Sequence, residues 1–512
     1  MAETGIRKWI VTFTIVTGVL LEIIDSTVVN VAMSNIIGAL NATLEDAAWI
    51  VTGYTIANVI VLPISGWLGD RIGRKKYFLI SILLFTVMSL FCGNATTLGQ
   101  LIVFRVLQGL AGGGLLSTGQ AILMETWPKE QFAMGMAIFG IGVVVGPALG
   151  PTLGGYIIDH LSWQWIFYIN LPVGLVAAFL VATFIRETPR FGHGDPIDWW
   201  GIALLAAFVG SLQMVLEKGQ SRDWFSDPMI TAFTAVSVVS GILFVWRELA
   251  TRYPVVNLSI FRHRNYLTGN IMMFVLGLVM YCSMFALPLF CQTILHLSAQ
   301  ETGMLLIPSS LVSMVGMPVV AKLSQRGVPP QILGAIGYIL FFVCLMMMSG
   351  ATIETGAGFF FWPMVIMGVA RGFLMVPFTQ LALQDLSGKE VGQGTGMNNL
   401  MRQLGGSFGI AVLTTILQVQ VGAFRNGLIP NVNPYNPAFQ ARFQALSGGF
   451  AAKGFSLDQA GTMALRSIEA AVMNQAQLLT YNKIYLGSGI MMLCCIGLLF
   501  FFRTGKKSPM QN

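Results

Sequence analysis

The chain has 512 residues, of which 55% are hydrophobic and only 10% are charged. This composition, with a mean hydropathy of +0.73, excludes an ordinary soluble domain and predicts a protein that crosses a membrane many times. The net charge of +7 is explained by basic loops on one side of that membrane, so it does not indicate a nucleic-acid-binding surface.

Fourteen apolar segments are each long enough to cross the bilayer as a helix, because about 20 residues span a hydrocarbon core of about 30 Å. Barrel strands would be only about 10 residues long and would alternate in polarity. We therefore expect an all-α polytopic membrane protein. The predicted spans are residues 9–32, 47–69, 77–94, 99–124, 131–157, 162–185, 197–216, 229–248, 266–291, 301–321, 331–350, 358–384, 391–417 and 482–502.

The first span contains two carboxylic acids, Glu22 and Asp25, in the stretch LEIIDSTVVNV. It is too long for a signal peptide and lacks a small-residue cleavage site, so we expect it to be retained. An ionised acid at mid-membrane costs on the order of 3 kcal/mol, and such groups usually face an interior cavity and serve function. Residues three apart share a helix face. The pair is a candidate proton-coupling and substrate site; the alternative is a structural hydrogen-bonded pair.

The loop after the second span, GWLGDRIGRKK, is one of several basic loops that alternate with loops poor in Lys and Arg. Basic loops mark the cytoplasmic side, so we expect both termini to be cytoplasmic. The short outer loops hold only Lys218 and Arg222.

Arg105 lies early in the fourth span, with Gln108 one turn later on the same face. Arginine keeps its charge at any depth, so within the bilayer it needs a carboxylate, backbone carbonyls or water. An arginine near a titrating acid favours the ionised acid and can release it when helices shift. The alternative role is helix packing through carbonyl contacts. Arg371 and Arg402 are similar candidates in the second half.

The fifth span contains GIGVVVGPALGPTLGG. Glycines spaced by four allow close helix approach, and prolines remove backbone donors and bend the helix. This pattern predicts a tightly packed helix that can act as a hinge. The residues concerned are Gly142, Gly146, Pro147, Gly150, Pro151, Gly154 and Gly155.

The order of spans and linkers predicts a 6+2+6 arrangement. A six-helix bundle occupies 1–186, a linker and two inserted spans occupy 187–265, and a second six-helix bundle occupies 266–512. The stretch GMPVVAKLSQRG, which begins at Gly316, weakly repeats the loop after the second span but lacks its acid. Internal repeats of this kind are typical of secondary transporters.

A long outer loop is predicted at 418–481, within the second bundle. Ser456 and Gln459 form a capping-box pattern that opens a predicted helix inside it. The loop is a candidate docking surface for a partner or a candidate cap over the exit path.

An enzyme is not indicated. The six cysteines lie in or beside apolar spans, the four histidines lie in separate loops, and the chain has no ATP-binding loop of the Walker type. We therefore expect no metal site and no cofactor.

Six stretches resemble one known family. GWLGDRIGRKK, RVLQGLAGG and GVVVGPALGPTLGG resemble, in order and at the expected spans, three signature motifs of the major facilitator superfamily drug:proton antiporters. LEIIDSTVVNVA, WQWIFYINLPVG and NNLMRQLGGSFG are similar to the fourteen-span branch of that group. The resemblance covers nearly the whole chain. It implies the major facilitator fold, in which two six-helix bundles rock around a central cavity.

The resemblance also implies roles for matching residues. Asp25 would be the proton and substrate acid, Arg105 the coupling arginine, and Gly146 with Pro147 the centre of the antiporter motif. The resemblance assigns no role to Glu22. A cytoplasmic gate would be formed by Gly66, Asp70, Arg71, Gly73 and Arg74, with Asp70 capping a helix of the other bundle that starts near Gly392. Second-bundle candidates are Arg371, Asn398 and Arg402.

These patterns predict a proton-coupled multidrug efflux permease of a bacterial inner membrane. Its partners would be drug-like molecules, protons, the lipid bilayer and, in a host with two membranes, a periplasmic adaptor (membrane fusion protein) and an outer-membrane channel. The alternative is an exporter dedicated to one metabolite class, such as a fatty acid, an amino acid or a siderophore. Acids in the pocket favour cationic substrates, whereas the resemblance favours hydrophobic acids, so the substrate charge stays open.

Overall fold

The computed structural model describes residues 5–187 and 196–501, and the predicted linker at 188–195 lies outside these residues. Within them, fourteen helical segments are long and apolar enough to cross a membrane, in agreement with the fourteen predicted spans. The helices are α1 (Arg7–Leu40), α2 (Leu44–Ala47), α3 (Trp49–Ile72), α4 (Arg74–Gly93), α5 (Leu98–Gly112), α6 (Leu115–Thr126), α7 (Phe132–His160), α8 (Trp165–Tyr168), α9 (Asn170–Phe184), α10 (Trp199–Lys218), α11 (Pro228–Ala250), α12 (Arg264–Thr293), α13 (Ala299–Gln325), α14 (Pro330–Ser349), α15 (Phe361–Leu383), α16 (Lys389–Leu428), α17 (Pro437–Ala452) and α18 (Leu457–Cys495).

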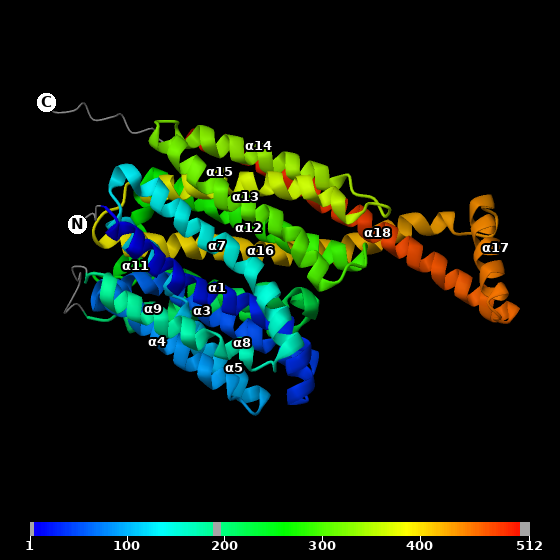
Figure 1. The fold of residues 1–512 in the computed structure, drawn as a ribbon, viewed down its shortest axis with the longest axis horizontal. Helices are drawn as coiled ribbons and strands as arrows, with labels where there is room; N and C mark the ends of the chain where they lie inside the picture. The colour runs from blue at the N-terminus through cyan, green and yellow to red at the C-terminus, as the bar shows by residue number, and fades with distance from the viewer. Residues whose placement is uncertain (1–4, 188–195, 502–512) are drawn as a thin grey trace.

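The helices form two bundles that lie side by side. Helices α1 to α9 make the first bundle, and α12 to α16 with α18 make the second (Figure 1). Two seams join the bundles, one between α3 and α16 and one between α7 and α13. Both ends of the described chain lie at one end of the bundles, which we call the terminal face; the opposite end is the distal face (Figure 1).

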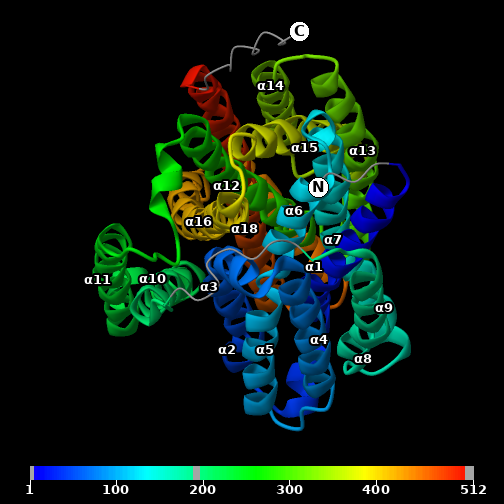
Figure 2. The same ribbon diagram turned by 90° about the vertical axis from the view of Figure 1, so that its left-hand side faces the viewer.

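Helices α10 and α11 form the inserted pair, which stands beside the bundles (Figure 2). Helix α10 packs against α3 of the first bundle and α16 of the second. Helix α11 is the outermost, and Ile242, Trp246 and Leu249 expose 66%, 66% and 71% of their surface. Such a large apolar surface on one helix indicates contact with lipid rather than water.

The predicted loop at 418–481 is mostly helical, which corrects the expected extent of the loop. Helix α16 continues to Leu428, α17 follows, and α18 begins at Leu457. Both hydrogen bonds of the predicted capping box at Ser456 and Gln459 are present. Hydropathy falls at residue 417, but a fall in hydropathy ends only the membrane-buried part of a helix. At 40 residues, α16 is about 60 Å long, twice the hydrocarbon thickness.

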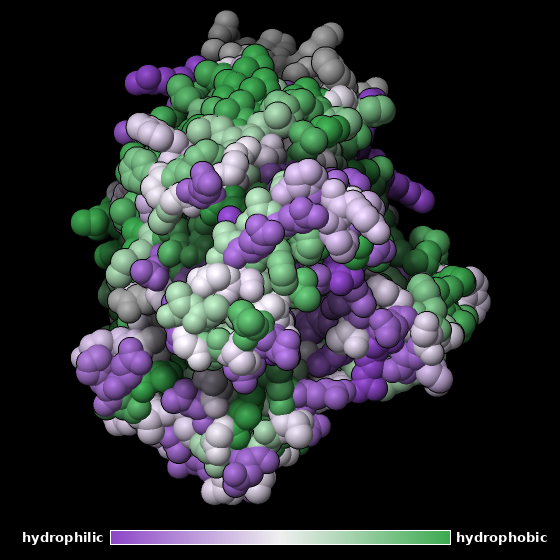
Figure 3. Space-filling model, turned by 90° about the vertical axis from the view of Figure 1, so that its right-hand side faces the viewer, coloured by the Kyte–Doolittle hydropathy of each residue, from purple (hydrophilic) through white to green (hydrophobic). Residues whose placement is uncertain are grey.

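The ends of α16 and α18 therefore project beyond the distal face and carry α17 with them (Figure 1). Viewed toward this end, hydrophilic side chains gather near the centre of the molecule, whereas the upper margin is apolar (Figure 3). The projection places α17 away from the membrane-spanning part of the fold (Figure 1), whereas Tyr481, at the end of the 418–481 segment, packs against Phe290 of α12.

Candidate functional site

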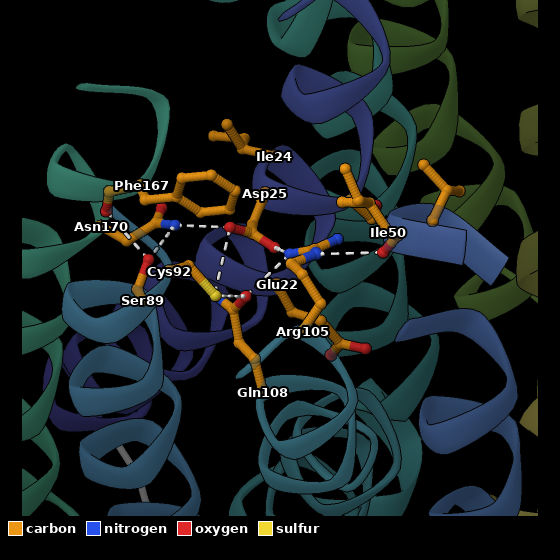
Figure 4. Close-up of polar contacts among 12 residues, drawn as sticks. Glu22, Ile24, Asp25, Ile50, Ser89, Cys92, Arg105, Gln108, Phe167 and Asn170 are labelled. Carbon is orange, nitrogen blue, oxygen red and sulfur yellow. Dashed lines mark hydrogen bonds and ion pairs between the residues drawn. The ribbon is translucent and has the colours of Figure 1, made fainter. Parts of the chain in front are cut away.

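Asp25 lies at the centre of a buried polar cluster in the first bundle (Figure 4). Its Oδ2 accepts a hydrogen bond from Arg105 Nη1 at 2.6 Å, and its Oδ1 accepts from Gln108 Nε2 at 3.2 Å and from Asn170 Nδ2 at 2.6 Å. Asp25 and Arg105 are each only 1% exposed. Three helices contribute to the cluster, so the acid is held by segments up to 145 residues apart in the sequence.

Arg105 has acceptors besides the carboxylate. Its Nη1 also donates to Gln108 Oε1 at 2.8 Å, and its Nε donates to the Ile50 carbonyl at 3.4 Å. The guanidinium lies 4.0 Å from the ring centroid of Tyr54, close enough for a cation–π contact. A buried guanidinium is costly unless it is paired and hydrogen-bonded, and this site provides both.

Asn170 connects the cluster to α4. Its Nδ2 also donates to Ser89 Oγ at 3.0 Å, and the Ser89 hydroxyl donates to the Phe167 carbonyl at 2.9 Å. Asn170 stands at the start of α9 and is 3% exposed. Sequence analysis did not identify it; the signal available was a lone amide in the apolar stretch FYINLPVG.

The Glu22 carboxyl group contacts other residues than the Asp25 carboxyl group does. Its Oε1 accepts from Asn58 Nδ2 of α3 at 2.6 Å, and within the described chain its Oε2 has no hydrogen-bond partner. Positions three apart on a helix differ by about 60° around its axis, and this angle directs the two acids toward different neighbours. The two acids therefore have separate hydrogen-bond partners, and their joint role in proton coupling stays a prediction.

A small cavity of about 20 Å³ lies between the bundles. It is lined by residues of α6, α7, α12, α15 and α16, namely Gln120, Met136, Phe139, Gly140, Val143, Met273, Met375, Thr379, Asn399 and Arg402. Asn399 Nδ2 donates to Gln120 Oε1 at 2.7 Å, so the amides join the two bundles here. Arg402 Nη1 donates to Tyr281 Oη at 3.3 Å. A cavity of this size holds about one water molecule.

The other second-bundle candidates, Arg371 and Asn398, are buried outside this cavity. Arg371 is 5% exposed, and its contacts are Ser309 Oγ at 3.5 Å and Met367 Sδ at 3.4 Å. Its Nε has no hydrogen-bond partner among the described residues. Asn398 Nδ2 donates to Asn270 Oδ1 at 3.5 Å. Neither residue belongs to the Asp25 cluster.

The glycines of the predicted antiporter motif face α1, the helix that carries Asp25. A Cβ added at Gly142 would lie 3.0 Å from Val16, and one at Gly154 would lie 3.2 Å from Val31. Between them, side chains added at Gly146 and Gly150 would collide with Ile23 and Thr27. The spacing of four therefore produces a continuous helix contact, as small residues do in membranes.

For the three other residues of this motif, no contact with α1 is described. Gly155 faces open space, so it takes no part in the contact. Pro147 and Pro151 both lie within α7, and the Pro151 side chain is outside the described part.

The predicted gate residues lie where α3 meets α16 on the terminal face. Gly66 is required by close approach, because a methyl group there would collide with the backbone of Gly392. Arg74, 2% exposed, donates to Asp70 Oδ1 at 3.0 Å, to Gly388 carbonyl oxygen of the second bundle at 3.2 Å, and to Glu125.

Three further details complete the gate. Asp70 is beside the first turn of α16, which begins at Lys389, three residues before the expected start. Gly73 joins α3 to α4 with φ +100°, which favours glycine. Arg71 lies over the ring of Trp67 at 5.4 Å.

A further partly buried acid, Glu217, was missed because the predicted span ended one residue before it. Gln213 Nε2 donates to Glu217 Oε1 and to Ser407 Oγ of α16, both at 2.9 Å. Glu217 is also hydrogen-bonded to Thr52 of α3. The inserted pair is thereby tied to both bundles. Two polar residues four apart on an apolar helix were the signal in the sequence.

Two six-helix membrane bundles, one of them with a buried charge cluster, are typical of a membrane transporter. The family model described as Major Facilitator Superfamily matches residues 15–410, so the chain belongs to this superfamily and is a multi-pass membrane transporter. The predicted superfamily, fold class and 6+2+6 arrangement are thus confirmed.

Two relatives and one solved structure are similar to the chain. The chain is 31% identical over 500 residues to Multidrug export protein EmrB of Escherichia coli strain K12, covering 97% of this chain and 96% of that protein. It is 28% identical over 491 residues to Fatty acid resistance protein FarB of Neisseria gonorrhoeae, covering 96% and 95%. A crystal structure of a double-tryptophan mutant of XylE matches with a TM-score of 0.58 at 13% identity, covering 97% of this chain and 99% of that one, a likeness of fold.

Proposed function

We propose that the chain is a multidrug efflux permease that exports amphipathic toxic compounds in exchange for protons. The observation that carries this proposal is Asp25, a carboxylate buried in the first span among Arg105, Gln108 and Asn170. Ionisable groups buried in membrane spans usually serve substrate or proton pathways. The similarity to Multidrug export protein EmrB along nearly the full chain supports drug-like cargo.

Proton binding at Asp25 would change the contact between α1 and α5. The ionised acid accepts from Arg105, and a neutral acid would lose the attraction of that ion pair. Arg105 would keep Gln108 Oε1 and the Ile50 carbonyl as acceptors and Tyr54 as a ring partner. The guanidinium therefore does not become isolated when the proton arrives, and the two helices can shift without unfolding the bundle.

Cargo would bind between the bundles, at the cavity lined by Arg402. Methionine side chains are flexible and polarisable, so Met136, Met273 and Met375 suit cargo of varied shape. The cavity is too small for a drug in this conformation. In our proposal it widens when the bundles rock apart.

The terminal face is proposed to be cytoplasmic, because its loops are basic. Both termini then lie in the cytoplasm, and the contact between Gly66 and Gly392 closes the cytoplasmic end. In a host with two membranes the chain would lie in the inner membrane. The projecting ends of α16 and α18 with α17 would then reach into the periplasm, where they suit docking of an adaptor that leads to an outer-membrane channel.

A dedicated fatty acid exporter is the second candidate. Similarity to Fatty acid resistance protein FarB favours it, and the Arg402 guanidinium beside the cavity would suit a carboxylate headgroup. Competition between structurally unrelated drugs and one fatty acid in the same vesicles separates the two candidates, because a dedicated exporter responds to the fatty acid alone.

Proton-driven export in proteoliposomes tests the proposal. A pH gradient and a membrane potential are imposed, and dye export is followed for the wild type, for Asp25→Asn and for Glu354→Gln, an exposed acid outside the cluster. Each charge crossing 100 mV supplies about 2.3 kcal/mol. We expect wild type and Glu354→Gln to export the dye against its own concentration gradient. Asp25→Asn should lose this uphill export.

Export by the wild type without a proton gradient or potential would contradict proton coupling. Export by Asp25→Asn at the wild-type rate would remove Asp25 from the mechanism. A variant that inserts and purifies normally but only equilibrates the dye would support the assigned role.

A further inference from the structure

A cavity of about 390 Å³ opens on the terminal face, between the inserted pair and the second bundle. It is bounded by the end of α11, by the segment 251–262 that leads to α12, and by the first turn of α16. Figure 2 looks onto this face. Three cationic side chains line it, Arg252, Arg262 and Lys389. The proposed transport cycle uses none of these residues.

The three cations are not ion-paired within the described chain, although the charge of Lys389 also acts on the nearby carboxyl group of Asp70. None of them forms a salt bridge among the described residues, and Arg252 instead lies over the ring of Tyr253 at 5.7 Å. The nearby acid Glu390 is 3.7 Å from His263 Nε2. Like charges gathered around one cavity repel one another, so an anion bound among them lowers the electrostatic energy.

Glu248 adds a requirement for a hydrogen-bond donor. Its carboxyl lines the same cavity and is 4% exposed. Oε2 accepts from the Val256 backbone N–H at 3.1 Å, whereas Oε1 has no partner in the described part of the protein. A buried acceptor without a donor is unfavourable. The complementary ligand therefore carries a negative group and, next to it, an N–H or O–H donor.

The cavity meets the lipid-facing surface of α11. Leu249 lines the cavity and is 71% exposed. Trp246 and Ile242, each 66% exposed, continue the same helix face at spacings of three and four. An acyl chain can lie along this apolar face while its headgroup occupies the cavity. A soluble anion has no acyl chain and would not contact this apolar face.

We infer that the cavity binds the headgroup of a membrane phospholipid with a donor close to its phosphate, such as phosphatidylglycerol or phosphatidylethanolamine. Basic pockets between membrane helices commonly hold lipid phosphates. The backbone N–H of Asn257 donates to Gln393 Oε1 of α16 at 3.2 Å. A bound headgroup thus joins the inserted pair to the first turn of α16, next to the contact with Gly66.

Lipid binding to the purified full-length protein in detergent tests this site without any assay of transport. Mass spectrometry that preserves non-covalent complexes measures binding of phosphatidylglycerol, phosphatidylethanolamine and phosphatidylcholine, which lacks the donor. We expect the first two to bind more tightly than the third. The variant Arg252→Gln with Arg262→Gln should lose phosphatidylglycerol affinity roughly thirtyfold, since each cation near lipid contributes about a fivefold effect.

A matched control is Lys322→Gln with Arg326→Gln, which removes two exposed cations from the same face outside the cavity. It should keep the wild-type affinity. The single variant Lys389→Gln should lose roughly fivefold. Unchanged affinity in the Arg252 and Arg262 variant, or an equal loss in the control, would overturn the site. Displacement of the lipid by millimolar inorganic phosphate would show a soluble-anion site and would overturn the lipid assignment.

Discussion

Each bundle buries an arginine in the fourth of its six spans, Arg105 in the first bundle and Arg371 in the second. Arg105 is matched by the carboxylate of Asp25, a side-chain amide, a backbone carbonyl and an aromatic ring. Among the described residues, the hydrogen-bond partners of Arg371 are a hydroxyl and a thioether at 3.4 to 3.5 Å. Related positions in the two halves therefore carry the same charge in different surroundings.

The different surroundings of the two arginines indicate that the two bundles respond differently to proton binding. A cation paired with a titratable acid responds to proton binding, whereas a cation held by uncharged groups does not. Among the described residues, the first bundle therefore pairs its buried arginine with a carboxylate, whereas Arg371 of the second bundle has no acidic contact. Repeated folds need not repeat their chemistry, because one side chain decides whether a buried charge is balanced.

The largest expected contrast is between Arg105→Met and Arg371→Met. Removing Arg105 leaves Asp25 buried without a cation, which costs about 3–5 kcal/mol of the free energy of unfolding. Removing Arg371 leaves no carboxylate unpaired among the described residues, so we expect a loss under about 1 kcal/mol or a gain. Unfolding of both variants in the same detergent measures the contrast. Equal losses would mean that Arg371 has an acidic partner.

The weak repeat between the halves gives a second contrast, Gly66→Ala against Gly316→Ala. A methyl group at Gly66 collides with the Gly392 backbone, whereas at Gly316 the nearest atom is Val369 Cα at 3.9 Å. We expect Gly66→Ala to disfavour the conformation closed at the terminal face by about 1–3 kcal/mol. Gly316→Ala should leave it unchanged.

Labelling of an engineered Thr395→Cys measures this closure, because Thr395 is fully buried at the seam. In a background without native cysteines, a water-soluble maleimide should react faster when Gly66→Ala is added. Equal labelling rates in both glycine variants would contradict the role of Gly66 as a close-approach position.

Asparagines allow a smaller comparison. Asn170 donates to the ionised Asp25 at 2.6 Å, whereas Asn398 donates to a neutral amide at 3.5 Å. Hydrogen bonds to charged groups contribute about 1.5–3 kcal/mol and neutral ones about 1 kcal/mol. Asn170→Ala should therefore destabilise the protein more than Asn398→Ala in denaturant unfolding. The reverse order would place the more important polar cluster in the second bundle.

The smallest expected effect is that of Glu22→Gln on proton-driven export. Glutamine keeps an oxygen that can accept from Asn58, and Glu22 is not joined to Arg105. We expect the export rate to fall less than tenfold, against complete loss for Asp25→Asn. If Glu22→Gln abolished export as well, the two acids would share one function despite their separate contacts.

The sequence by itself determined the fourteen spans and the helix start at Leu457, because span length and capping are local properties. It also indicated that Asp25 and Arg105 need partners, since a charge in lipid is costly wherever the helix lies. Its largest error of extent, the loop at 418–481, arose because hydropathy reports the membrane boundary and not the helix end.

Only the tertiary structure decided which groups meet. Asn170 reaches Asp25 across 145 residues, and Glu217 binds through Gln213 to Ser407, 194 residues beyond that glutamine. Glu22 and Asp25, three residues apart, separate because helix rotation directs them to different neighbours. Burial follows from local composition, whereas pairing depends on the rotation and packing of helices far apart in the chain, which no local pattern encodes.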